Sequence, residues 1–251
     1  MFLLYGQHTK RNSLYTSGTK TPDAKLTSDV TILRYVRPMK WGDYIIAPQI
    51  FAPFGRLRAG DSVAALGSTT GVADLIFAMP VWILHDNAAR NMFLIVPYLF
   101  VPTGSYDKNR ALNLGENRWK TALQIGGSFG IHKNFSIEVW GDVTFFGENN
   151  DFGQASTTLK QKPLYQYQSY FNWHQSPGTT FAFGLSHATG GEQRVNDVAM
   201  NNRTSTTKAV LTGSTFVSPA NQVMVSIGRD LSVENGFKEE ARVNLRFLHV
   251  F

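Results

Sequence analysis

The feature that most constrains this chain is a strict alternation of apolar and polar residues, clearest between Trp119 and Phe146. From Trp119 to Ile131 every second residue is apolar, glycine or threonine, and the residues between them are small or polar. His132–Asn134 then form a tight turn, and the alternation resumes at Phe135. Successive side chains of a β-strand point to opposite faces, so this pattern predicts a hairpin with one apolar face and one polar face.

The same period of two recurs along the whole chain, and hardly any segment has the apolar stripe of a helix. The intervening segments alternate between long and short, which predicts an all-β, transmembrane antiparallel β-barrel with long extracellular loops and short periplasmic turns. Twelve strands are expected, at 1–10, 26–38, 43–54, 69–84, 91–102, 118–131, 135–147, 163–174, 179–190, 204–217, 222–233 and 239–251. Long loops are expected at 11–25, 55–68, 103–117, 148–162 and 191–203; short turns are expected at 39–42, 85–90, 132–134, 175–178 and 218–221, with 234–238 a short exception.

Strand length and hydropathy fit a membrane barrel better than a soluble β-sandwich. The longest apolar run, from Met92 to Pro102, is too short for a membrane helix of about 20 residues and contains two prolines. Many expected strands run to about 12 residues, roughly twice the usual sandwich strand. No linker divides residues 1–251, so one barrel domain is expected.

The ends of the chain and its cysteine count agree with this prediction. The last segment alternates from Glu240 and closes on Phe251, which resembles the terminal signal of outer-membrane barrels read by their assembly machinery. The first residues lack the features of a signal peptide, so we expect a leader to have been removed. The chain has no cysteine, which excludes disulfides and thiolate chemistry and suits passage through an oxidising periplasm.

Aromatic residues gather near the ends of the expected strands, and two prolines fall inside strands. The aromatic residues form interfacial girdles in one interpretation and core residues in the other. Pro48 and Pro97 predict local breaks or bulges in the wall, which are either functional or merely tolerated. The aromatic residues concerned are Tyr35, Trp41, Tyr44, Trp119, Tyr165, Tyr167 and Trp173.

The net charge of +6 is spread over the whole length without a basic run, which argues against a nucleic-acid partner. Many of the cations fall in expected loops, where they suit the phosphates of lipopolysaccharide; ordinary solvated loop charge is the alternative. Outer-membrane lipid and lipopolysaccharide are therefore the expected partners, and a monomer the expected state. The cations are Lys10, Arg11, Lys20, Lys25, Arg56, Arg58, Lys108, Arg110, Lys160, Lys162, Arg194 and Arg203.

No phosphate-binding loop, metal-ligand cluster or nucleophile elbow is present, so no cofactor or metal and no catalytic residue is expected. Ser186 and His187 are the only pair that suggests hydrolysis. Adjacent strand residues point to opposite faces, so these two cannot act together, and we expect Ser186 inside and His187 outside.

The alternation predicts which polar residues face the lumen. They carry both signs of charge, which produces a transverse field across a hydrated passage; the alternative is a salt-bridge network that fills the interior. The expected pore-lining residues are Asp74, Lys120, Gln124, Glu138, Trp140, Asp142, Glu240, Arg242, Asn244 and Arg246, with Phe146 beside them.

The chain resembles the bacterial outer-membrane channels of the meta-pathway phenol-degradation family. The resemblance rests on the run Gly71–Leu75, on the segment Val96–Asp107 with its Pro102-Thr103-Gly104 corner, and on the hairpin from Trp119 to Phe146. It implies a monomeric channel for passive uptake of small molecules, hydrophobic or aromatic in class, and no catalytic residues. Asp74 is the one position carried over as a matching motif residue.

Three functions remain open at this point. The first is a diffusion channel, which is not an enzyme. The second is a phospholipase-like barrel enzyme acting on lipid, and the third is a structural barrel with a plugged lumen. The channel predicts ion conductance, and the enzyme predicts hydrolysis that is lost on Ser186→Ala.

Overall fold

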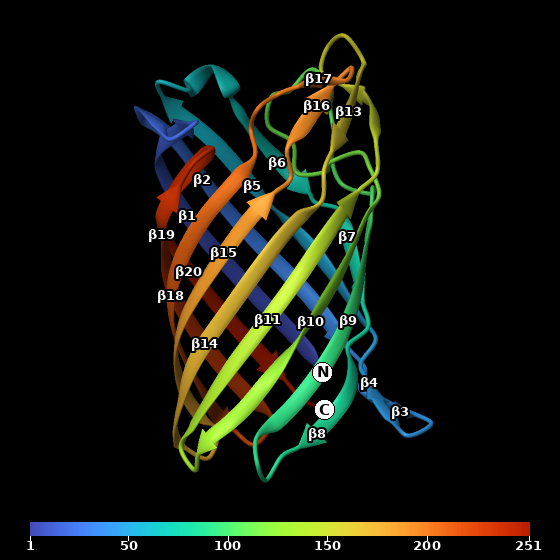
Figure 1. Cartoon of the computed structure of the whole chain (residues 1–251), viewed down its shortest axis with the longest axis vertical. Helices are drawn as coiled ribbons and strands as arrows, with labels where there is room; N and C mark the ends of the chain where they lie inside the picture. Colours follow the sequence, from blue (N-terminus) through green and yellow to red (C-terminus); the bar gives the residue numbers. More distant parts are fainter.

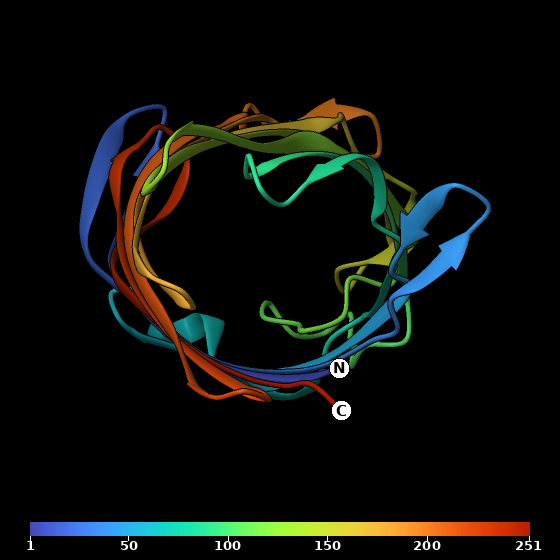
Figure 2. The same ribbon diagram turned by 90° about the horizontal axis from the view of Figure 1, so that it is seen from below.

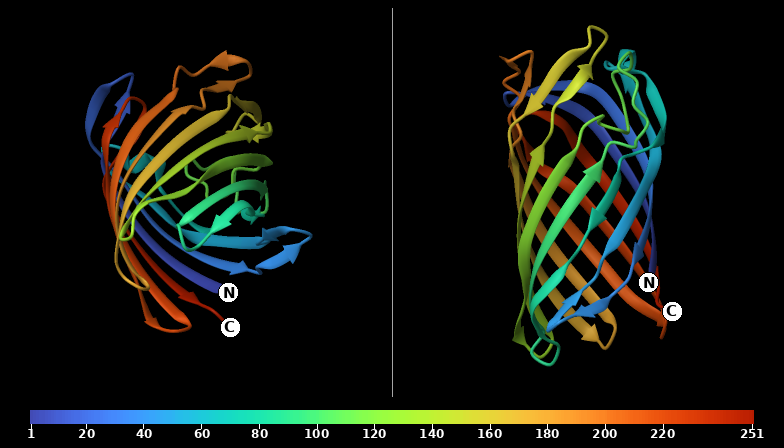
Figure 3. Two further views of the ribbon diagram at one scale, coloured as in Figure 1. Left: turned by 60° about the horizontal axis from the view of Figure 1, so that its bottom comes forward. Right: turned by 90° about the vertical axis from the view of Figure 1, so that its right-hand side faces the viewer.

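The computed structural model describes residues 1–251, and its antiparallel strands close into a barrel (Figure 1). The ring has twelve strand positions, which we call staves; one of them is made of several short strands. Each stave pairs with its neighbour in the chain, and the pairing of β1 with β20 closes the ring. Seen along its axis the barrel is an open ring of tilted strands (Figure 2). Both termini lie side by side at the lower end (Figure 3).

The staves have the following bounds. They are β1 (Phe2–Thr16), β2 (Thr19–Val36), β5 (Gln49–Asp61), an interrupted stave of β6 (Ser68–Val72), β7 (Leu75–Ala78) and β8 (Val81–Asp86), β9 (Asn91–Val101), β10 (Lys120–His132), β11 (Phe135–Phe146), β14 (Leu164–Ser176), β15 (Thr179–Gly190), β18 (Thr204–Ser218), β19 (Asn221–Val233) and β20 (Gly236–His249). The only helix is the short 3-10 turn η1 (Ala64–Leu66), and no helix is long and apolar enough to cross a membrane.

The alternation read from the sequence sets the register of the wall. In the β10–β11 hairpin, Leu123 pairs with Val143 on the outer face and Gln124 pairs with Asp142 on the inner face. The apolar side chains point outward and are exposed, so the buried apolar clusters are small. This inverted distribution is the one that a bilayer solvent requires.

The aromatic residues near the strand ends are not core residues. Their exposed fractions run from 43% for Trp173 to 67% for Trp41, and two of them stack on neighbouring rings: Tyr35 on Phe251 at a centroid distance of 6.4 Å and Trp173 on Phe181 at 5.6 Å. This finding removes the interpretation as core aromatics and agrees with interfacial girdles. The full set is Tyr35, Trp41, Tyr44, Trp119, Tyr165, Tyr167 and Trp173.

Two of the expected long loops are shorter than expected. The first loop, expected at 11–25, is a two-residue turn at Ser17 and Gly18, because β1 and β2 extend well beyond their expected ends. The loop expected at 55–68 begins only after Asp61. The upper parts of these strands carry polar residues on both faces, so the alternation that marks a membrane strand fades while the pairing continues.

Two further sheet segments lie outside the expected strands. The turn expected at 39–42 is a longer excursion, 37–48, that holds the hairpin β3 (Met39–Trp41) and β4 (Tyr44–Ile46) at the lower end of the barrel. At the upper end a small separate sheet extends two of the long loops. It consists of β12 (Asn149–Phe152), β13 (Thr157–Gln161), β16 (Gln193–Val195) and β17 (Val198–Ala199).

Both prolines lie at breaks in the wall, as expected. Pro48 lies in the break between β4 and β5, whereas Pro97 lies within the continuous strand β9, opposite the break between β7 and β8. Pro80 itself lies in that second break. Backbone hydrogen bonds cross the breaks, from Ala47 N–H to Pro80 O at 3.0 Å and from Met79 N–H to Pro97 O at 3.2 Å. The wall is therefore irregular here but remains hydrogen-bonded.

Candidate functional site

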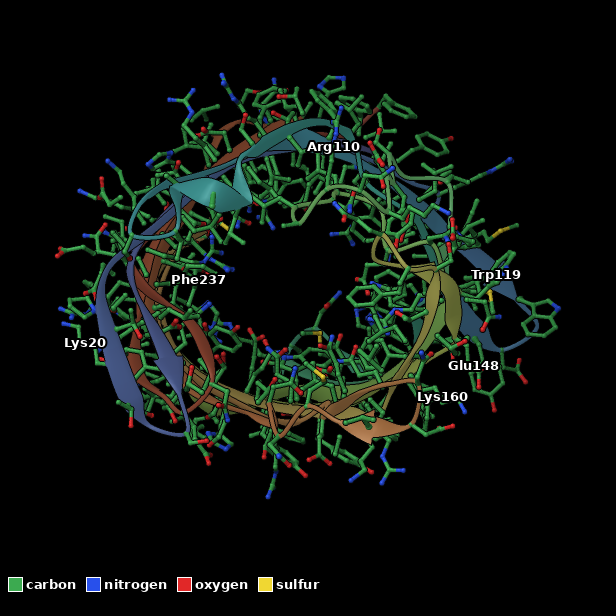
Figure 4. All side chains as sticks on the ribbon, turned by 90° about the horizontal axis from the view of Figure 1, so that it is seen from above. Lys20, Arg110, Trp119, Glu148, Lys160 and Phe237 are labelled. Carbon is green, nitrogen blue, oxygen red and sulfur yellow. The ribbon has the colours of Figure 1, made fainter.

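The inner face of the barrel encloses a polar cavity of about 770 Å³. Its lining comes from β10, β11, β14, β15, β18, β19 and β20, which form more than half of the wall. With all side chains drawn, the view along the axis retains open space at the centre of the ring (Figure 4). The interior therefore retains an open space with a partly polar lining at the centre of the ring (Figure 4).

Most of the residues expected in the lumen face it. Gln124 and Glu138 lie on one side of the cavity, and Arg242 lies on the other. Lys120 and Asp142 also point inward: the Lys120 ammonium lies 4.6 Å from the ring centre of Phe100, and Asp142 accepts a hydrogen bond from Gln168 at 3.4 Å. The cavity is lined by six members of the expected set, namely Gln124, Glu138, Trp140, Arg242, Asn244 and Arg246.

Glu240 lies elsewhere than expected. The pairing of β1 with β20 shifts register between Lys10 and Arg11, so that Lys10 faces Ala241 and Arg11 faces Glu239. Because of this bulge, Glu239 and not Glu240 faces the inside of the barrel. Glu239 is buried, and the Glu240 carboxylate lies 3.6 Å from the guanidinium of the exposed Arg229. An extra residue in one strand shifts every following side chain to the other face, which an alternation count cannot detect.

Asp74 also has a different position from the expected one. It lies in the break between β6 and β7 and is only 5% exposed. Its carboxylate accepts hydrogen bonds from the backbone N–H groups of Gly104, at 2.9 Å, and Glu116, at 3.1 Å. Asp74 therefore anchors the loop between β9 and β10 to the wall and does not line the open passage.

That loop, residues 102–119, folds into the barrel, where its green ribbon lies inside the ring of strands (Figure 2). Ser105 continues the sheet beside β6, since its N–H donates to Val72 O at 2.8 Å. The loop crosses itself where Gly104 meets Gly115, and a Cβ atom at Gly104 would lie 2.6 Å from the Gly115 Cα. The loop therefore narrows one side of the lumen and depends on two glycines to do so.

Glu116 ties the base of this loop to β10. Its carboxylate accepts from Arg118 Nη2 at 2.6 Å and from the ammonium of Lys120. Burial raises the pKa of the Glu116 carboxyl, but the charges of Lys120 and Arg118 and their hydrogen bonds outweigh burial and leave the pKa below its ordinary value. Glu116 is thus ionised whenever the loop is docked at neutral pH.

The buried Glu239 organises a cluster of cations high on the inner wall. Arg11 Nη2 lies 2.8 Å from the Glu239 carboxylate and Lys208 Nζ lies 2.6 Å from it, and Arg242 donates to it as well. Asp230, only 2% exposed, lies 3.6 Å from Lys208 and accepts the Glu239 N–H at 2.7 Å. Three cations therefore share two carboxylates in this cluster.

Some lumen residues were missed by the sequence argument. Arg34 points inward between the exposed Leu33 and Tyr35, and its guanidinium lies 4.6 Å from the ring centre of Phe51. The alternation of β2 contained this signal, because an arginine between two outward apolar residues must face the inside. Glu239, Arg11 and Lys208 were missed for a different reason, since they meet only through the bulge described above.

Ser186 and His187 point to opposite faces. Ser186 lines the cavity, while His187 Nδ1 lies 3.0 Å from Thr207 Oγ1 on the outer face. Ser186 faces Gln168 and Lys208 on its neighbouring strands, and the Lys208 ammonium is paired with Glu239 at 2.6 Å and Asp230 at 3.6 Å instead of acting as a base on Ser186. No group of three or more His, Cys, Asp or Glu side chains is placed to hold a metal ion.

Comparison with known proteins gives a family and a fold. A family model described as "Putative MetA-pathway of phenol degradation" matches residues 11–247. An outer membrane channel from Pseudomonas putida F1 is 37% identical, with a TM-score of 0.97 over 100% of this chain and 94% of that chain. The β domain of the Bordetella autotransporter BrkA (9% identity, TM-score 0.65, 100% and 99% covered) and the NanC porin (10%, 0.54, 100% and 100%) share the fold alone. A search of curated proteins finds no match.

Proposed function

The chain belongs to the family described as MetA-pathway of phenol degradation, and from that premise we propose that it is an outer-membrane channel for the passive uptake of small molecules. The family name, together with the apolar rings that face the lumen, supports hydrophobic or aromatic compounds as the substrate class. The protein resides in the outer membrane of a Gram-negative bacterium.

The observation that carries this proposal is the open interior. A cavity of about 770 Å³ lies against the inner wall from β10 to β20, and its lining mixes charged groups, amides and aromatic rings. Such a lining offers water and solute many weak contacts instead of one tight site, which conduction requires. The predicted pore-lining role of Lys120, Gln124, Glu138, Trp140, Asp142, Arg242, Asn244 and Arg246 is part of this proposal.

The plugged-barrel alternative is less well supported. The loop 102–119 folds inward but docks against the wall through Asp74 and Ser105, so it narrows the lumen from one side and leaves the axis free (Figure 4). The enzyme alternative is less well supported because Lys208, the one basic residue opposite Ser186, is paired with Glu239 and Asp230. Retained lipid hydrolysis by a Ser186→Ala variant would remove the role of that serine.

We place the lipopolysaccharide contacts of this proposal on the upper wall rather than on the loops. Several loop cations are already paired with loop carboxylates, such as Lys108 with Asp151 at 3.0 Å and Lys160 with Asp197 at 2.9 Å. Arg56 and Arg58 lie on the outer face of β5 without a carboxylate within 4.0 Å, and lipid phosphates are suited to pair with them.

The test is the current through purified protein in a planar lipid bilayer. A channel gives stepwise conductance in potassium chloride at each insertion. A bilayer that remains silent although insertion has been verified would contradict the proposal and favour the plugged barrel.

A further inference from the structure

Charged residues of both signs line the lumen, and two of its arginines have no acidic partner. Arg34 donates to Gln49 Oε1 at 2.7 Å and to the Tyr5 hydroxyl at 2.8 Å, and Arg246 donates to Gln222. Neither guanidinium has a carboxylate within 4.0 Å, in contrast to the cations gathered around Glu239. Arg34 and Arg246 therefore present net positive charge to the passage.

These two arginines lie on β2 and β20, the two strands that flank β1, with Tyr5 of β1 between them. Tyr5 is the register partner of Arg246 across β1 and β20, and its hydroxyl accepts from Arg34 on β2. All three residues lie near the strand ends that carry the short turns, which is the periplasmic end of the barrel. The amide oxygens that hold the guanidinium groups fix their positions without neutralising them.

An apolar aromatic patch lies beside this pair. We use this name for Phe51, Trp82, Tyr98 and Trp140, which pack against the buried residues Ala78, Leu94 and Val96 on the inner wall. Arg34 stacks directly on Phe51, at 4.6 Å from its ring centre. A flat apolar surface thus continues into a positively charged one.

The opposite side of the lumen carries the complementary charge. Glu138 accepts from Asn172 at 2.9 Å and from Trp140 Nε1 at 3.1 Å, and Asp142 accepts from Gln168 at 3.4 Å. Neither carboxylate has a cationic partner within 4.0 Å. A field between the two sides orients a charged solute, with its anionic end toward the arginines.

We propose that this arrangement is a transit site for aromatic carboxylates, in which the ring lies on the aromatic patch and the carboxylate pairs with Arg34 and Arg246. The inference rests on the proposed channel function and names a substrate class for it. Guanidinium groups bind carboxylates through paired hydrogen bonds, and aromatic rings stack on tryptophan and tyrosine. A site of this kind conducts only if the solute binds well enough to enter and weakly enough to leave, and two such contacts on one side of an open passage suit that requirement.

The experiment compares benzoate with matched probes on the intact protein in planar bilayers. The reversal potential is measured in gradients of sodium benzoate and of benzylammonium chloride, which carry a similar ring with opposite charge. We expect benzoate to be about tenfold more permeant than benzylammonium, a ratio that corresponds to roughly one charge-assisted contact. Benzoate should also block the potassium chloride current at concentrations where acetate, which lacks the ring, does not.

The variants isolate the two arginines. The double variant Arg34→Gln, Arg246→Gln should reduce the benzoate-to-benzylammonium ratio by about three- to tenfold, since it removes both charges from the site. Arg229→Gln is the matched control, because Arg229 lies on the outer face with 59% of its side chain exposed, and it should leave the ratio unchanged.

The outcomes separate this inference from the channel itself. Conductance in potassium chloride with no preference of the wild-type protein for benzoate would overturn the aromatic carboxylate site and leave the channel intact. An unchanged ratio in the double variant would also overturn it. A wild-type bilayer without any conductance would contradict the proposed function, and the inference would fail with it.

Discussion

Asp74 holds Gly104 by a hydrogen bond of 2.9 Å from the Gly104 N–H to its buried carboxylate, and so joins the break in one stave to the loop that enters the barrel. The same carboxylate accepts the Glu116 N–H at the other end of that loop. One side chain thus closes residues 104–116 into a docked unit. The width of the passage depends on this anchor.

Replacing the anchor should loosen the loop. Asp74→Ala leaves two backbone N–H groups without acceptors, at a cost of about 1–3 kcal/mol each if they remain buried. We expect a lower unfolding midpoint in urea and a noisier open-channel current as the loop moves in the lumen. Asp43→Ala is the control, because Asp43 lies in the exposed turn of the β3–β4 hairpin. Equal noise in the two variants would mean that Asp74 does not anchor the loop.

The contact between Gly104 and Gly115, where the loop 102–119 crosses itself, should be equally sensitive to the size of the side chain at position 104. Gly104→Ala places a Cβ atom 2.6 Å from the Gly115 Cα and 2.8 Å from the Asp74 nitrogen, so the loop backbone must shift. We expect a change in single-channel conductance together with a loss of stability of about 1–3 kcal/mol. Gly141→Ala, which meets only a Tyr167 ring atom at 3.9 Å, should behave as wild type. A Gly104→Ala protein with normal conductance and stability would contradict the described packing.

Low pH should release the loop 102–119 from β10 by protonating Glu116. Because the pKa of this carboxyl is lower in the folded chain than its ordinary value of 4.5, its pairing with Lys120 and Arg118 stabilises the fold above pH 4.5 and is lost as the pH falls through the folded value. Current noise should therefore be low at neutral pH and rise only below pH 4.5. Glu116→Gln should be noisy already at neutral pH and lose this dependence. A wild-type channel that remains quiet well below that pH would count against the role of Glu116.

Substitution of two adjacent glutamates, Glu239 and Glu240, should lower the free energy of unfolding by very different amounts. Glu239→Gln leaves Arg11, Lys208 and Arg242 around a neutral side chain, which should cost about 3–5 kcal/mol in the free energy of unfolding. Glu240→Gln breaks only a long, largely exposed pair with Arg229 and should cost less than about 1 kcal/mol. Urea unfolding of both variants in the same detergent measures the difference. Similar costs for the two would mean that the bulge is misplaced.

The barrel wall could be predicted from the sequence because its physical cause is local. A strand between lipid and water alternates residue by residue, so the outward direction of Leu123 and the inward direction of Gln124 follow from their neighbours alone. The same rule gives the inward direction of Asn244 and Arg246 on β20. Each strand carries its own evidence, and no knowledge of its partner is needed.

The parts that were wrong depend on contacts between distant segments. Glu240 was assigned to the lumen, whereas Glu239 faces it, because of a bulge that exists only in the pairing with β1. Asp74 was assigned to the lumen because its partners, the N–H groups of Gly104 and Glu116, belong to a loop without periodicity. Above the membrane the alternation ceases to be required, so β1 and β5 were ended too early and β2 was begun too late.

The central claim is that solutes pass through the lumen of this barrel, and the absence of cysteine from the chain permits a direct test. A single thiol is introduced at Asn244, which lines the cavity, or at Leu245, which faces outward with 55% exposure. Single-channel current is then recorded before and after a bulky, charged thiol reagent is added. We predict a lasting fall in conductance for Asn244→Cys and no change for Leu245→Cys. If labelling of Asn244→Cys is verified and its current is unchanged, the conducting path does not run through this lumen.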